Sequence, residues 1–131
     1  MMDSDQVAGP ERITETAPCP SYLLQPKSQG QVVLRCTHIN NWLDLLCIDP
    51  GTHLIDRGSG EKSWLVHTEG IPLHPEHLQI ERDTHRFLLV FQPLPAGCEE
   101  FVFIEPCQGG YEAFNIPRNR MDVYDLVPRC P

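Results

Sequence analysis

Residues 86–116 read RFLLVFQPLPAGCEEFVFIEPCQGGYEAFNI, and this stretch decides the fold class. Three short runs rich in aromatic and β-branched residues are separated by prolines and glycines. Such runs are typical of β-strands, because proline and glycine interrupt regular structure between them. The stretch shows no pattern of catalytic residues, so it predicts structure rather than activity.

The same organisation continues toward the N-terminus. Residues 31–38 alternate apolar and polar side chains, as a half-buried strand does. A second run, 42–48, follows the turn residues Asn40 and Asn41, so we expect the two runs to form a hairpin. Further short strands are expected at 52–56 and 62–67, and a strand or a helical turn at 77–81 and 122–127.

No segment shows the 3.6-residue periodicity of a helix, so the pattern predicts an all-β protein, an antiparallel sandwich or barrel of about seven strands. The 131 residues are enough for one domain. We divide them into a loosely ordered N-terminal arm (1–30), a β-sandwich domain (31–116) and a charged C-terminal tail (117–131). Four apolar side chains are expected to fill the core: Phe101, Phe103, Phe114 and Ile116.

The charge of the chain excludes several classes of partner. Ten basic residues face eighteen acidic ones, and the net charge is −8. Nucleic acids and anionic membrane surfaces attract clusters of Lys and Arg, so neither is an expected partner. No stretch approaches the roughly 20 apolar residues of a membrane helix, so no membrane insertion is expected.

The N-terminus begins Met-Met-Asp-Ser-Asp and has no apolar leader segment. A cytoplasmic location follows if Met1 is the native start. A periplasmic or cell-surface location follows if a leader has been trimmed, and the doubled methionine favours trimming.

An ordered series of short segments resembles a known family. The series comprises residues 41–43, 52–56, 60–62, 69–73, 91–95 (FQPLP), 101–105 (FVFIE) and 114–116 (FNI). It resembles the uncharacterised immunoglobulin-like β-sandwich domain of Bacteroidetes cell-envelope proteins, over residues 31–116. The resemblance implies a single antiparallel immunoglobulin-like sandwich, often beside another domain in an exported protein, with no assigned activity and no catalytic residues.

His74 and His77 are the candidate metal ligands. They form the only close histidine pair, and Glu76, His67 or His85 could complete a zinc site with them. Zinc sites of the His-Glu-x-x-His type lie on a helix, however, and proline at position 75 opposes a helix. The preferred interpretation is a solvated loop, so we expect no metal, cofactor or catalytic residue.

The chain has six cysteines, which allow 15 disulfide connectivities. Cys36 and Cys47 are expected on the core faces of adjacent strands, as buried thiols. Cys98 and Cys107 flank one extended strand and lie too far apart to bond each other. Their available partners are the remaining two cysteines, Cys19 and Cys130. No Cys-x-x-Cys pair is present, so thiol exchange chemistry is not indicated.

Three functions remain open. The leading hypothesis is a non-enzymatic module for protein–protein contact or an accessory role in the cell envelope, with a protein partner or neighbouring domain. The second is a metal- or thiol-dependent enzyme that uses His74, His77 and a cysteine. The third is a carbohydrate- or peptide-binding sandwich with Trp42, Trp64 or Tyr111 as a stacking platform; against it, large rings such as the tryptophans are more often core anchors.

Overall fold

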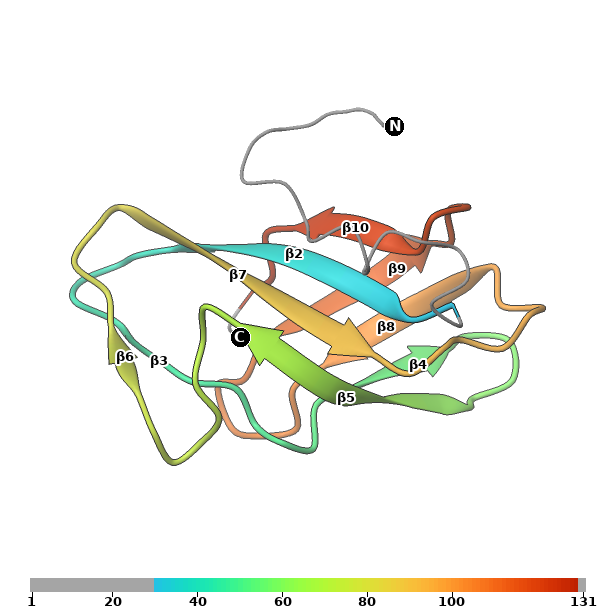
Figure 1. Ribbon diagram of the computed structural model, residues 1–131, viewed down its shortest axis with the longest axis horizontal. Coiled ribbons are helices and arrows are strands. Elements are labelled where there is room, and N and C mark those ends of the chain that lie inside the picture. Colours follow the sequence, from blue (N-terminus) through green and yellow to red (C-terminus); the bar gives the residue numbers. More distant parts are fainter. Residues whose placement is uncertain (1–29, 130–131) are drawn as a thin grey trace.

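The computed structural model describes residues 30–129, and within this range the protein consists of strands, turns and loops (Figure 1). The strands are β2 (Val32–Ile39), β3 (Leu45–Leu46), β4 (His53–Asp56), β5 (Lys62–Glu69), β6 (Leu78–Gln79), β7 (Thr84–Phe91), β8 (Glu100–Ile104), β9 (Glu112–Pro117) and β10 (Val123–Leu126). The predicted all-β class is confirmed. Nothing in residues 30–129 could serve as a membrane-spanning helix.

Seven strands form one sheet in the order β10-β2-β7-β5-β4-β8-β9. Its neighbours are antiparallel except for β10, which runs parallel to β2 at the sheet edge. Of the two interpretations of residues 122–127, the edge strand is therefore correct. Glu112 of β9 exchanges backbone hydrogen bonds with Arg129, just beyond β10, at N–O distances of 2.9 and 3.2 Å. The two edges thus approach each other, and the sheet is nearly closed and barrel-like.

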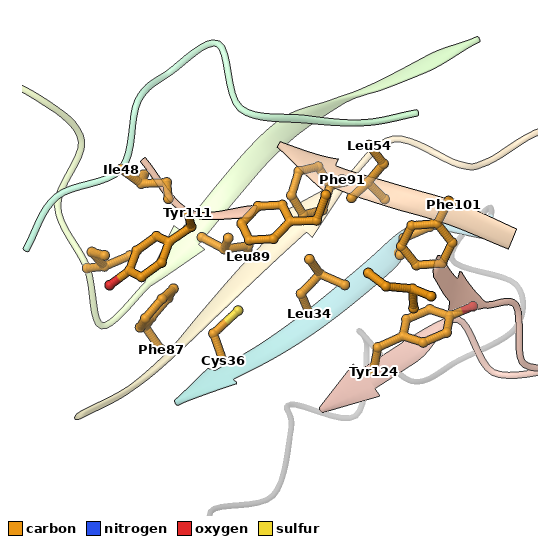
Figure 2. Packing of buried hydrophobic residues seen from close by; sticks show 14 of the residues in the cluster. Leu34, Cys36, Ile48, Leu54, Phe87, Leu89, Phe91, Phe101, Tyr111 and Tyr124 are labelled. Carbon is orange, nitrogen blue, oxygen red and sulfur yellow. The ribbon is translucent and has the colours of Figure 1, made fainter. Parts of the chain in front are cut away.

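The curved sheet encloses one apolar core. Phe101 of β8 meets Tyr124 of β10 with ring centroids 5.0 Å apart, and Phe91 of β7 meets Phe103 of β8 at 6.1 Å. Figure 2 shows the rings of Phe91, Phe101 and Tyr124 in the same core as Leu34 from β2. Each such buried side chain contributes about 1.5–3 kcal/mol relative to an exposed one.

The predicted hairpin between 31–38 and 42–48 is wrong. All eight residues of β2 pair with β7, from Val32 opposite Phe91 to Ile39 opposite Thr84. The short strand β3 pairs instead with β6 and makes a separate two-stranded ladder. The long ladder with β7 offers β2 far more backbone pairing than the two residues of β3 could.

Phe114 is 57% exposed, so the expectation that it fills the core is wrong, whereas Phe101, Phe103 and Ile116 are buried as predicted. Phe101 pairs with Ile116, yet Phe103, two residues on, pairs with a residue three positions before Ile116. Asn115 adopts φ 58° within this bulge. The extra residue breaks the alternation of side chains and turns the Phe114 ring to the surface.

The β3–β6 ladder continues into a parallel bridge between Ile48 and Leu73. We call residues 45–48 and 73–79 together the ribbon. Figure 1 shows it standing beside the main sheet, beyond one end of β2 and β7. Leu46 and Ile48 are buried and join the main core, so the ribbon is fixed to the sheet.

The predicted N-terminal arm, apart from residue 30, lies outside the described residues, as do Cys19 and Cys130.

Candidate functional site

The ribbon brings Cys47, His74 and His77 together. The Cys47 sulfur and one ring nitrogen of each histidine all lie within 4.8 Å of one another. The sequence separates Cys47 from the histidines by more than two dozen residues, and backbone pairing closes that gap. Ile48 N–H donates to the Pro72 carbonyl, and His74 N–H donates to the Ile48 carbonyl, each at 2.9 Å.

A turn sets the spacing of the two histidines. Glu76 N–H donates to the Leu73 carbonyl at 3.0 Å, so residues 73–76 reverse the chain before β6 begins. The imidazoles of His74 and His77 stand edge to face, with ring centroids 6.1 Å apart. The predicted absence of a helix at Pro75 is confirmed, and both histidines are exposed.

The other predicted ligands lie elsewhere. His67 pairs with Glu69 at 3.1 Å, and His85 Nε2 lies 2.6 Å from the Gly70 carbonyl. Glu76 supplies no donor atom to the cluster, whose three members are the only such group among residues 30–129. The predicted histidine pair is therefore part of the cluster. Its third member is Cys47, which the sequence pattern had assigned to the core.

Buried and acidic surroundings act on the Cys47 thiol. Burial, and then the negative charges of Glu105 and Asp49, raise its pKa. Glu105 is itself buried, and its carboxylate accepts hydrogen bonds from the backbone N–H groups of Asp49 at 2.8 Å and Tyr111 at 2.9 Å. The Glu105 carboxylate therefore caps backbone N–H groups of two separate loop segments.

The described cysteines are all free thiols. Cys36 lies in the core, where burial raises its pKa, so the expectation of a buried thiol is confirmed. Cys47 is half-buried and lies on the ribbon rather than on a strand beside β2, so that expectation is wrong. As predicted, Cys98 and Cys107 form no bond with each other.

Trp42 lies on the loop that leads from β2 into the ribbon, and it is 80% exposed. The Asp44 carboxylate accepts the backbone N–H groups of Asn41 at 3.0 Å and Trp42 at 3.3 Å. His38 Nε2 lies 2.7 Å from the same carboxylate. The hydrogen bonds from Asn41, His38 and Trp42, in that order, lower the pKa of Asp44.

Further hydrogen bonds, made by Asn40 within the loop and by His38 of β2, hold the loop in place. Asn40 accepts a hydrogen bond from Asp44 N–H and donates to the carbonyls of Ile80 and Arg82. His38 Nδ1 lies 2.8 Å from the buried Tyr111 hydroxyl. The loop is thus linked to the core on one side and to the segment that precedes β7 on the other. The Trp42 indole remains in solvent.

The three predicted stacking platforms differ in how exposed their rings are. Tyr111 is buried, so its assignment as a platform is wrong. Trp64 is 44% exposed on β5, with the Lys62 ammonium 5.5 Å from its ring centroid. The high exposure of Trp42 contradicts the interpretation of that ring as a core anchor.

Large exposed apolar residues are frequent on the loop of Trp42 and on the ribbon. Of eleven such residues in the described range, six lie at the last position of β2, on this loop or on the ribbon. They are Ile39, Trp42, Leu43, Leu45, Leu73 and Leu78. Large contiguous exposed apolar patches often mark interaction sites, whereas single exposed apolar residues are common on any protein surface. Comparisons of the chain with protein-family models, with curated proteins and with solved structures found no match.

Proposed function

We propose that this chain is a non-enzymatic β domain that binds a partner protein through the Trp42 loop and the ribbon. The observation that carries the proposal is the 80% exposure of an indole on a loop whose backbone is fixed by hydrogen bonds. An exposed tryptophan is costly to keep in water, and tryptophan is the residue most enriched among the anchors of protein interfaces.

The energy available at this residue is large. A tryptophan side chain buries about 150–250 Å² on docking, which is worth roughly 4–6 kcal/mol at 25 cal/mol per Å² before the costs of association. Because Asp44 and Asn40 already hold the loop, little loop entropy is lost when a partner binds. The surrounding leucines would exclude water from the contact.

A non-enzymatic role is supported by the structural roles of the aspartates whose pKa values are shifted. Asp44 and Asp56, whose pKa values are lowered, both accept backbone N–H groups of tight turns. Turn capping is a sufficient reason for these shifts.

The finer proposal is that the domain is a variant immunoglobulin-like sandwich that works in the cell envelope. The family resemblance of residues 31–116 implies both the fold and the compartment. Its support in the structure is the way β8 faces β7 and β10 across one apolar core, as opposite layers of a sandwich do.

A photo-crosslinking experiment tests the partner. A photoreactive phenylalanine analogue replaces Trp42, and the full chain is irradiated in extracts of the organism that encodes it. We expect a discrete protein adduct that excess unlabelled wild-type chain prevents and excess Trp42→Ala chain does not.

The control places the same analogue at Val66, an apolar residue on β5 that is 50% exposed. Equal adducts at both positions, or competition by Trp42→Ala as strong as by wild type, would contradict the proposal. Saturable quenching of Trp42 fluorescence by oligosaccharides, without a protein adduct, would replace it with the sugar-binding alternative.

A further inference from the structure

We propose that Cys47, His74 and His77 bind one zinc ion on the outer side of the ribbon. A thiolate and two imidazoles are ligands that Zn²⁺ prefers, and Ca²⁺ or Mg²⁺ would instead require oxygen ligands. The three donor atoms converge from two segments of chain that are far apart in sequence. This inference is independent of the proposed protein partner.

The geometry is close to that of a bound site. Zn–S bonds of about 2.3 Å and Zn–N bonds of about 2.0–2.1 Å place tetrahedral donors roughly 3.3–3.7 Å apart. The donors here lie within 4.8 Å of one another, so they must close by about 1 Å. Neither imidazole forms a hydrogen bond with another described residue, and both are exposed, so rotation of the rings can supply that movement.

The backbone beneath the ligands is already in place. The β3–β6 ladder fixes the chain on one side of Cys47, and the hydrogen bonds between Ile48, Pro72 and His74 fix it on the other. The turn at Leu73–Glu76 fixes the distance between the histidines. Because the scaffold is preorganised, ion binding needs to order side chains only.

Three protein ligands leave one position of a tetrahedral ion open. The nearby carboxylates are already engaged, since Asp49 Oδ1 accepts Gly51 N–H at 2.6 Å and Glu105 bridges two backbone N–H groups. His74 and His77 are exposed, so the fourth position faces solvent and takes a water molecule.

Metal titration of the reduced, metal-free full chain tests the site. We expect calorimetry to show one Zn²⁺ per chain. Co²⁺ should give the visible bands of a tetrahedral ion together with a thiolate-to-metal charge-transfer band in the near ultraviolet. Cys47→Ser should abolish the charge-transfer band, and Cys47→Ser, His74→Ala and His77→Ala should each weaken Zn²⁺ binding at least tenfold.

Cys107→Ser and His67→Ala are matched controls, because each removes an exposed residue of the same type outside the cluster. Both should bind Zn²⁺ as tightly as wild type. Circular dichroism of each variant, compared with wild type, separates lost binding from lost folding. The proposal is overturned if the wild-type chain binds no stoichiometric Zn²⁺, or if well-folded ligand variants bind as tightly as the controls.

Discussion

Aspartate side chains fix the turns of this protein, and Asp56 shows how. Its carboxylate accepts Gly58 N–H at 2.9 Å and the Ser59 hydroxyl at 2.8 Å, directly after β4. These hydrogen bonds favour the charged form and lower the pKa of Asp56. A single side chain thus closes the turn between β4 and β5.

The lowered pKa of Asp56 predicts a loss of stability in acid. The unfolded chain has an aspartate pKa near 4, above that of the folded state, so protonation favours unfolding. The stabilisation by Asp56 is complete above about pH 4 and is lost as the pH falls below it. Urea unfolding from about pH 6 to pH 2 should show a shallower acid loss in Asp56→Asn than in wild type. Asp83→Asn, an exposed control, should follow wild type, and an unchanged slope in Asp56→Asn would count against the turn-capping role.

Substitutions at two glycines distinguish the effect of backbone conformation on stability from the effect of packing. A Cβ added at Gly60 or at Gly97 would meet no atom within 4 Å, but only Gly60 has a positive φ, of 80°. Gly60→Ala should therefore destabilise by about 1 kcal/mol through backbone strain. Gly97→Ala should be neutral or stabilise by about 0.4–1 kcal/mol through the unfolded state. Thermal unfolding measures the stability of both variants. Equal changes in stability would contradict the conformational explanation.

At the scale of elements, sequence located the strands better than it paired them. Alternation and turn residues are local signals, and they placed β2, β4, β5, β7, β8 and β9 within a few residues of their bounds. Pairing depends on contacts between distant segments, so the expected hairpin with 42–48 gave way to the ladder between β2 and β7. The bulge at Asn115 carried no local signal strong enough to correct the alternation that put Phe114 in the core.

The bulge in β9 predicts a contrast between two phenylalanines. Phe101→Ala removes a fully buried ring and should cost about 3–5 kcal/mol. Phe114→Ala removes a ring that is 57% exposed and should cost less than about 1 kcal/mol. Chemical denaturation measures both, and comparable losses would show that β9 lacks the bulge.

The ribbon predicts a local response to zinc. Since the ligands bridge residues 47 and 74–77, an ion that binds only the folded ribbon stabilises it against local opening. Hydrogen–deuterium exchange of the full chain should slow in 44–49 and 72–80 when Zn²⁺ is added. Exchange in β8 and β9 serves as the internal control and should not change. Protection spread evenly over the sheet would argue against a site confined to the ribbon.

At the scale of the whole molecule, the curved sheet forms the stable core, and the candidate binding residues lie at one end of it. The buried side chains of the sheet account for the core, whereas the Trp42 loop and the ribbon hold five of the eleven exposed large apolar residues among 30–129 and also the thiol–imidazole cluster. Sequence identified His74 and His77 as a pair, because they are neighbours in the chain. It assigned Cys47 to the core, because its meeting with the histidines depends on the β3–β6 ladder and the Ile48–Leu73 bridge, which are nonlocal.

The most direct test of this division is a scan of photo-crosslinking positions over the exposed apolar residues. The analogue replaces, in turn, Trp42 and Leu45 at the proposed binding end, and Trp64, Val66 and Phe114 on the curved sheet. We expect partner adducts at the first two positions and none above background at the other three. Adducts that form mainly at Trp64, Val66 or Phe114 would contradict it, because the curved sheet would then be the binding surface.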